Sequence, residues 1–414
     1  MEEAADTRAL DAWAAGMSAL RDSLLALLRA RYGEDVPAFV RGRFDTEFEY
    51  VWIGGTAPFL RAYEAVARAA AKAGESVWNR GYGCGSLLFW LLGGGVNPLP
   101  PHWRCGACGR VEAGEGAALC FGLPPRECPG CGSPMARDGV ACPAEEALRG
   151  GLEIRVNEGF LDAACRAALG ALPGARVLRQ SRRHAPRPSR RRAFYAAEDG
   201  ALPEGLPVYR GPDGAECVFA EDVAKSPPGL LQFTFVVPED GPVPGETLPV
   251  EAWMQRPPDV EPLLRGMRGR AGDVPGGALD RMARLAELLQ PRDWGSLVET
   301  ACFAFGNYSR LGEVSVEELA RRIRESPFRH ALYCREALQE YLQGRGVPAI
   351  LAWQMARQVS TGRKGWEMGV YGEKTPELAG DELFRSAEYL WSRTHAVEWM
   401  GRYLFIESTA ALGR

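Results

Sequence analysis

The feature that most constrains how this chain can fold is a set of four cysteines in its first third. They form two Cys-x-x-Cys pairs separated by nineteen residues: Cys105, Cys108, Cys128 and Cys131. Each pair can aim two thiolates at one point, and the neighbouring glycines permit the tight turns required. This spacing predicts a zinc-ribbon-like module within 97–143, with Cys120 and Cys142 as alternative ligands. Because four thiolates leave no open coordination position, we expect the zinc to be structural.

The length, net charge and cysteine content of the chain limit the kinds of protein that it can be. The chain has 414 residues, 46% of them hydrophobic, which is enough for two or three domains or subdomains. Its net charge of −4 indicates no polyanionic partner by itself. The longest apolar run, 87–96, is shorter than the ~18 residues of a membrane span, and the N-terminus is acidic. Eleven cysteines, an odd number, suit a reducing compartment, so we expect a cytoplasmic protein without a membrane partner.

Hydrophobic periodicity predicts mixed secondary structure followed by helices alone. Apolar residues recur at helical spacing over 5–31, 57–74 and 160–171. Strand-like patterns occupy 151–159, 206–210 and 231–237, within a Pro-, Gly- and Arg-rich middle. Beyond residue 277 the patterns are helical over 278–290, 294–304, 315–325, 328–343, 347–361 and 381–405. We therefore expect an α+β part that leads into an all-helical part.

A glycine-rich stretch at 79–87 is a candidate anion-binding turn. Backbone amides between alternating glycines can approach a phosphate, and a neighbouring arginine can clamp it. The residues concerned are Arg80, Gly81, Gly83, Gly85 and Ser86. The alternative is an ordinary tight turn without a ligand.

A second candidate binding segment is basic. Residues 179–194 contain seven arginines, one histidine and no acidic residue, and their prolines and serines disfavour a helix. We expect a mobile loop that contacts DNA or RNA phosphates, the alternative being a solvated loop. The arginines that carry this prediction are Arg182, Arg183, Arg187, Arg190, Arg191 and Arg192.

Several of these stretches together resemble the PolC-type alpha subunit of bacterial DNA polymerase III. The glycine-rich turn is similar to that family's Arg-Gly-Ser-Gly-x-Gly-Ser segment, with Tyr82 in place of serine. The run Asn97 to His102 and the four cysteines follow in the family's order. The stretches 31–51 and 334–365 resemble the lead into the palm and the fingers of the family. The stretch 389–405 resembles the fingers helix that lies near nucleotide and template, with Arg393 and His395 as matching residues.

The resemblance implies a fold, a set of domains and a set of partners. It implies an α+β, nucleotidyltransferase-like palm with a zinc-ribbon-like insertion, followed by an all-helical fingers region. The expected division is a helical lead at 1–56, the palm at 57–275 and the fingers at 276–414. Primer-template or single-stranded DNA, a deoxynucleoside triphosphate and replication proteins are the implied partners. We expect none of the replicase's exonuclease, PHP, tandem helix-hairpin-helix or clamp-binding regions in the printed chain.

The resemblance also points to a defect in the catalytic site. The family has Asp-Ile-Asp-Leu-Asn where this chain has Glu153, Ile154, Arg155, Val156 and Asn157. By its spacing to a proline, Glu251 matches the third family carboxylate. An arginine among these ligands would repel two magnesium ions by several kcal/mol, on the order given by an effective dielectric of about 20. Magnesium binding is therefore doubtful, unless the true carboxylates are Asp162 or Glu158.

Three functions follow from these observations. The favoured one is a PolC-like protein that binds primer-template DNA and nucleotide without efficient polymerisation, with a role in DNA replication or repair. The second is an active minimal DNA polymerase that uses Glu153 and Glu251. The third is a zinc-stapled scaffold for protein contacts. Magnesium binding separates the first two, and DNA binding separates both from the third.

Overall fold

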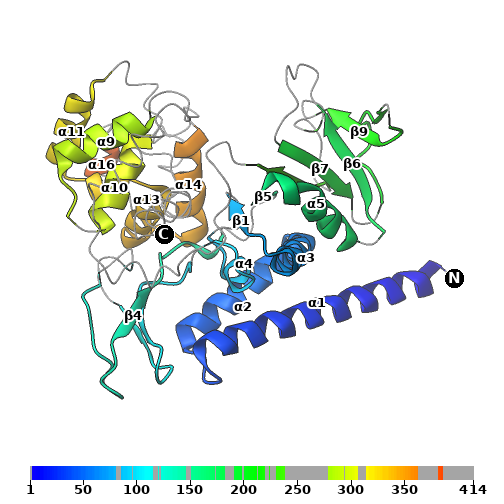
Figure 1. Cartoon of the computed structure of the whole chain (residues 1–414), viewed down its shortest axis with the longest axis horizontal. Helices are drawn as coiled ribbons and strands as arrows, with labels where there is room; N and C mark the ends of the chain where they lie inside the picture. Colours follow the sequence, from blue (N-terminus) through cyan, green and yellow to red (C-terminus); the bar gives the residue numbers. More distant parts are fainter. Residues whose placement is uncertain are drawn as a thin grey trace. The chain divides into compact units, whose positions relative to one another are not determined.

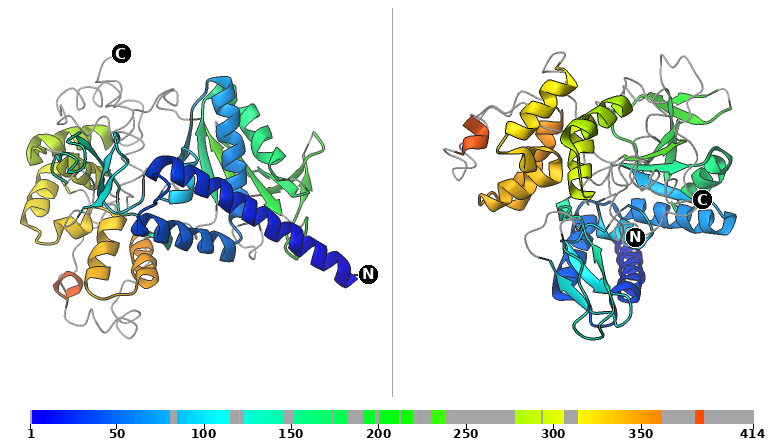
Figure 2. Two further views of the ribbon diagram at one scale, coloured as in Figure 1. Left: turned by 90° about the horizontal axis from the view of Figure 1, so that it is seen from below. Right: turned by 60° about the vertical axis from the view of Figure 1, so that its left-hand side comes forward.

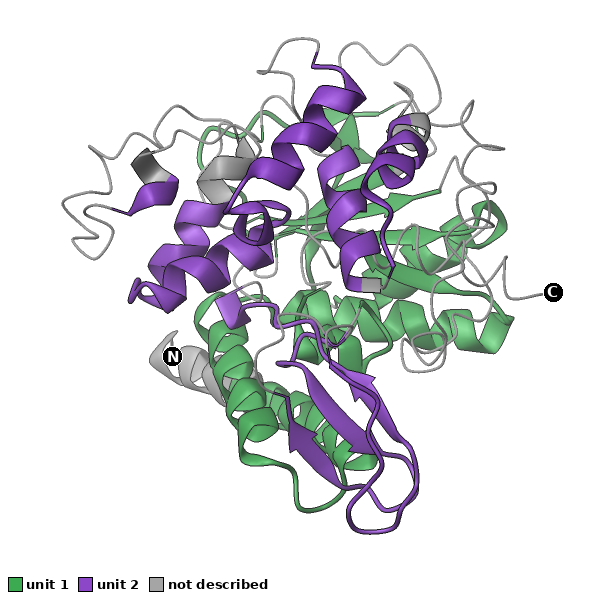
Figure 3. Cartoon of the chain, turned by 90° about the vertical axis from the view of Figure 1, so that its left-hand side faces the viewer, with its two compact units in different colours: residues 1–95, 146–246 green, residues 96–145, 247–414 purple. Residues whose placement is uncertain are grey.

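The computed structural model divides the chain into two compact units, which Figure 3 colours separately. Unit 1 comprises residues 1–95 and 146–246, and unit 2 comprises 96–145 and 247–414. Each unit is described by itself. The structure describes residues 2–80, 85–95, 97–114, 120, 123–145, 151–172, 174–181, 191–197, 200–211, 213–219, 223, 230–237, 278–292, 294–305, 314–361 and 381–385. The predicted boundary near residue 275 lies outside these ranges.

Unit 1 begins with four helices. They are α1 (Glu2–Tyr32), α2 (Ala38–Ile53), α3 (Ala57–Ala73) and α4 (Leu87–Leu91). An ion pair of 2.7 Å between Arg21 and Asp45 joins the first two, which run side by side (Figure 2). The predicted end of the third helix at Gly74 is correct, because this residue adopts the left-handed conformation (φ 67°) that glycine tolerates. The sequence patterns did not predict α2.

A seven-stranded sheet forms the centre of unit 1 (Figure 1). Its order is β1-β5-β10-β7-β6-β9-β8, so strands distant in the sequence become neighbours. Most neighbours pair antiparallel, whereas β5 with β10 and β6 with β9 pair parallel. The strands are β1 (Val77–Arg80), β5 (Leu152–Val156), β6 (Arg176–Ser181), β7 (Arg191–Ala197), β8 (Tyr209–Arg210), β9 (Glu216–Phe219) and β10 (Leu231–Val236).

The loop within the arginine-rich stretch 179–194 is shorter than we predicted. Both of its ends belong to the sheet, in β6 and β7, which pair antiparallel up to Arg179 and Phe194. The loop prediction is therefore wrong for 179–181 and 191–194, because strand pairing satisfies the backbone there. Residues 182–190 lie outside the described residues.

One face of the sheet is apolar and is covered by helices. Ile154 on β5 and Phe233 on β10 have no exposed surface, and the Phe233 ring lies 5.0 Å from that of Phe59 on α3. Helix α5 (Leu161–Gly170), which follows a short 3-10 turn (Glu158–Phe160), packs against α3 on the same side (Figure 1). Because side chains alternate along a strand, the residues between these apolar positions point to the opposite face.

Unit 2 contains the cysteine module and a helical part. The module is a three-stranded antiparallel sheet of order β3-β2-β4, formed by β2 (His102–Cys105), β3 (Val111–Ala113) and β4 (Met135–Asp138). The helices are α9 (Ala278–Leu289), α10 (Trp294–Phe305), α11 (Val316–Glu325), α12 (Arg329–Leu332), α13 (Arg335–Gly344), α14 (Ala349–Thr361) and α16 (Glu382–Arg385). None of the described helices of either unit is both long and apolar enough to cross a membrane.

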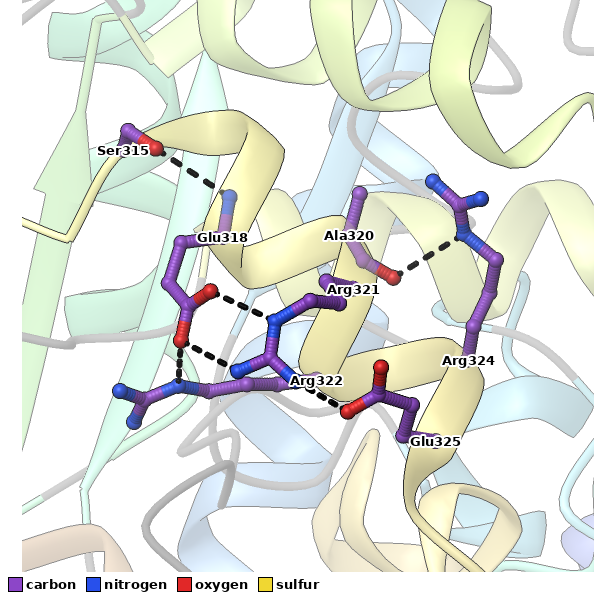
Figure 4. A network of polar contacts seen from close by, with 7 residues as sticks. All are labelled: Ser315, Glu318, Ala320, Arg321, Arg322, Arg324 and Glu325. Carbon is purple, nitrogen blue, oxygen red and sulfur yellow. Dashed lines mark hydrogen bonds and ion pairs between the residues drawn. The ribbon is translucent and has the colours of Figure 1, made fainter.

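Two features of the helical part follow from local chemistry. The predicted helix over 328–343 is broken at Cys334, whose backbone is extended and whose sulfur accepts the Ala337 amide as an N-cap. Helix α11 begins at Ser315, whose hydroxyl accepts the Glu318 amide at 3.2 Å. The Glu318 carboxylate accepts hydrogen bonds from Arg321 and Arg322 at 2.8 Å (Figure 4), and these bonds lower its pKa to about 2.

Candidate functional site

The four predicted cysteines come together at the tip of the module. The Cys105 and Cys131 sulfurs lie 3.5 Å apart, as do those of Cys108 and Cys128, and all four lie within 4.8 Å of one another. A tetrahedron of thiolates around zinc, with Zn–S distances of about 2.3 Å, has edges of about 3.8 Å. The donor set therefore fits a tetrahedral metal ion, and the prediction that these four residues cluster is confirmed.

The two halves of the cluster are built alike. In each, the amide of a glycine four residues after the first cysteine donates to that cysteine's carbonyl: Gly109 to Cys105 at 3.0 Å and Gly132 to Cys128 at 2.8 Å. Both glycines have positive φ angles, 73° and 72°, which explains why glycine stands there. Hydrogen bonds from Ser133 lower the pKa of the Cys131 thiol to about 6, whereas at Cys108 the lowering effect of the Arg110 backbone is outweighed by hydrogen bonds with the neighbouring thiols, which raise the pKa of Cys108 to about 12.

The base of the module is a buried polar network that the sequence patterns did not reveal. The Asn97 amide donates to Asp138 at 2.7 Å, and the Gly139 amide donates to the same carboxylate at 2.8 Å. Nδ1 of the fully buried His102 lies 2.8 Å from the Pro100 carbonyl. These bonds tie the start of the module to the end of β4.

The alternative ligands are not needed. Cys120 and Cys142 are buried, with exposed fractions of 0% and 2%, and do not belong to the sulfur cluster. Among the described residues, the four cysteines of the two pairs form the single group of three or more potential ligands that lies close enough to hold a metal ion.

The side chains of Glu153 and Arg155 lie on the face of the sheet opposite the helices. They alternate on β5 with Leu152, Ile154 and Val156, which are all buried in the apolar core. Glu153 is half-buried and Arg155 is buried, with 5% of its surface exposed. A carboxylate and a guanidinium thus occupy neighbouring positions of one face, as the strand-like alternation predicted.

The strands on both sides of β5 place further residues in register with Glu153 and Arg155. Arg80 at the end of β1 is the register partner of Glu153, and Trp78 is the partner of Arg155. On the other side, Thr234 of β10 is the partner of Glu153. The sheet therefore brings the strand that leads into the glycine-rich turn directly beside the two candidate catalytic positions.

The end of the glycine-rich turn is held by helix α2. Ser86 donates from its hydroxyl to the buried Glu47 at 2.7 Å, and the Gly85 carbonyl accepts from Arg43 at 3.2 Å. Gly81 and Gly83 lie outside the described residues. Neither Arg43 nor Glu47 was predicted; a glutamate among the apolar positions Val40 to Val51 of an amphipathic helix is the signal that could have revealed it.

The structure places the remaining predicted residues as follows. Arg192 forms an ion pair with Asp162 on α5, and Arg191 opens β7 as the register partner of Val236. Asp162 thus belongs to the side of the sheet that the helices cover, and Glu158 is an exposed residue of the 3-10 turn beyond β5. Outside the described residues are Glu251, Arg182, Arg183, Arg187, Arg190, Arg393 and His395.

Sequence comparison identifies relatives of part of this chain. No protein-family model matches it. The PolC-type DNA polymerase III of Thermotoga maritima is 35% identical over 119 residues, which are 28% of this chain and 9% of that protein. The PolC-type enzyme of Bacillus subtilis is 32% identical over 136 residues, or 31% of this chain and 9% of that protein.

The similarity is thus confined to a small part of much longer enzymes. The PolC-type enzyme of Pediococcus pentosaceus, 35% identical over 127 residues, is covered to 8% of its length. These findings agree with the resemblance to the PolC-type family. Over about three tenths of its length, the chain is a relative of PolC-type DNA polymerase III.

Proposed function

We propose that this protein binds primer-template DNA and a deoxynucleoside triphosphate in the manner of a PolC palm, without efficient polymerisation, in DNA replication or repair. The observation that carries the proposal is the position of Arg155. It lies two residues after Glu153 on β5, on the same face of the sheet. Two-metal chemistry needs oxygen ligands at such neighbouring positions, and a guanidinium there repels the dications that the chemistry requires.

The structural cysteine cluster and the candidate substrate-binding groups resemble the family more closely than the candidate metal ligands do. The cysteine cluster fits a tetrahedral metal, and we assign zinc to it because thiolate ligands in this geometry favour zinc. Arg80, the residue before the glycine-rich turn, adjoins Glu153 through the β1–β5 register. The segment 182–190, which links β6 to β7 in the sequence, contains arginines that supply positive charge for phosphates.

A binding experiment tests the DNA part of this proposal. Fluorescence anisotropy with a labelled primer-template, in EDTA and in magnesium, should show salt-sensitive binding that does not need magnesium. Replacing Arg187 and Arg190 by glutamine should lower the salt slope by about two, since each phosphate contact contributes about 0.9. The matched control is Arg41→Gln with Arg68→Gln, two partly exposed arginines on α2 and α3.

The outcomes separate the candidate functions. Salt-sensitive binding with an unchanged slope in the control variant supports the proposal. Wild-type protein that keeps its zinc and binds no DNA would instead favour the scaffold, the class of protein whose inherited fold serves protein contacts alone. Binding that appears only in magnesium would favour an active polymerase, because it would require dications at the sheet face.

A further inference from the structure

A buried carboxylate binds the end of the glycine-rich turn. Glu47 on α2 has no exposed surface, and its two oxygens accept four hydrogen bonds. One comes from Arg43, the others from the Ser86 hydroxyl at 2.7 Å, the Leu87 amide at 3.0 Å and the Leu88 amide at 3.3 Å. The carboxylate is therefore saturated with donors, as a buried charge must be.

Arg43 extends this contact to the turn itself. Its guanidinium donates to Glu47 and also to the Gly85 carbonyl at 3.2 Å. Arg43 thus donates to the carbonyl of residue 85, and Glu47 accepts from the donors of residues 86 to 88. At the other end of the turn, Arg80 is fixed by its register with Glu153. The residues on both sides of 81–84 are thus bound to neighbouring elements, Arg80 to β5 and residues 85–88 to α2.

We infer that Arg43 and Glu47 are positioning residues for the phosphate-binding turn, and that Ser86 acts through Glu47 and not on the phosphate. This inference rests on the proposed nucleotide binding. The single hydroxyl proton of Ser86 and the amide protons of Leu87 and Leu88 are already donated to Glu47. None of these three protons is therefore available to a triphosphate.

A double-mutant cycle tests this assignment. Binding of dATP is measured by calorimetry for the wild type, Glu47→Gln, Ser86→Ala and the double variant. Glu47→Gln should weaken binding about tenfold or more, because it disrupts a fully satisfied buried ion pair. The double variant should bind no more weakly than Glu47→Gln, because the two residues act as one unit. Additive losses would overturn the inference, since they would mean that Ser86 contacts phosphate independently.

The matched control lies two residues before Glu47, on the same helix. Asp45 pairs with Arg41 at 2.8 Å with the same four-residue spacing, but both side chains are partly exposed. Asp45→Asn should leave dATP affinity unchanged. If Glu47→Gln fails to fold, Arg43→Lys replaces it, because lysine keeps the charge but lacks the forked donor that reaches both Glu47 and Gly85.

Hydrogen–deuterium exchange provides a readout that does not depend on nucleotide. The amides of residues 85–88 should exchange faster in Glu47→Gln than in the wild type and at the wild-type rate in Asp45→Asn. Unchanged exchange in folded Glu47→Gln would overturn the inference. A wild type that binds no dATP would contradict the proposed nucleotide binding, and the exchange result would then decide the positioning role alone.

Discussion

Arg155 follows Glu153 by two positions on β5, so a cation and a carboxylate lie on the same face of the central sheet. Arg80 on β1 and Thr234 on β10 are the register partners of Glu153. In the related polymerases the resemblance places metal-binding aspartates at both positions. Under the proposed function, an arginine at one of these positions would repel the dications that two-metal chemistry requires. Ile154 between these two residues and Val156 beside them are buried in the core of the sheet.

Removal of a cluster cysteine should abolish metal binding. Cys128→Ser replaces a buried thiolate, and we expect metal content to fall from about one zinc ion per chain to near zero, with a lower melting temperature. Elemental analysis and thermal melts measure both quantities. The control is Cys120→Ser, which changes a cysteine that is equally buried but outside the cluster. Full zinc content in Cys128→Ser would contradict the assignment.

Replacing Asn79 or Asn97 by leucine should change the stability of the protein in opposite directions. Both are buried, but within the described structure neither polar atom of the Asn79 side chain has a hydrogen-bond partner, whereas Asn97 donates to Asp138. Asn79→Leu should stabilise the protein by about 1 kcal/mol, and Asn97→Leu should destabilise it by about 2 kcal/mol. Chemical denaturation measures both changes. Destabilisation by Asn79→Leu would indicate that the amide has a partner, such as a buried water.

Gly139 should tolerate no side chain. Its φ is 97°, and an added Cβ would lie 2.5 Å from the Pro100 carbonyl oxygen. Gly139→Ala should therefore destabilise the protein by more than 2 kcal/mol, about 1 kcal/mol of which is the cost of the left-handed backbone. Gly33 has a similar φ of 85° with no atom near an added Cβ, so Gly33→Ala should show the backbone cost alone. Equal losses in denaturation experiments would contradict the steric part of this account.

Protonation of Glu318 at low pH should lower the stability of helix α11. The pKa of Glu318 is lowered from 4.5 to about 2 by hydrogen bonds from Arg321 and Arg322. Because the folded pKa is below the unfolded one, this stabilisation is fully present above pH 4.5 and is lost as the pH falls towards 2. Carboxyl resonances in an NMR titration should give the low midpoint, and salt should raise it by screening. A midpoint near 4.5 at low salt would refute the ion pairs.

Local patterns in the sequence predicted several parts of this structure. Cysteine spacing predicted the sulfur cluster, because Cys-x-x-Cys turns are determined by a few adjacent residues. Strand alternation predicted that Glu153 and Arg155 share a face. Helical periodicity predicted α1, α3 and α9 to within a few residues.

The parts that could not be predicted depend on distant partners. Strand β1 has four residues and becomes a strand by pairing with β5, more than seventy positions later. Strands β6 and β7 flank an arginine-rich stretch whose composition indicates a loop, and tertiary pairing overrides that preference. The contact of Glu47 with Ser86 spans 39 positions, so the local pattern of α2 could not identify the partner of Glu47.

The most direct test of the central claim is primer extension by the zinc-loaded protein on a labelled primer-template, in magnesium and in manganese. We predict DNA binding without extension in either metal, and a trace of extension when Arg155→Asp restores an acidic ligand beside Glu153. Extension by the wild type that is lost in Glu153→Ala would contradict the account, because it would show that this sheet face supports two-metal chemistry despite Arg155.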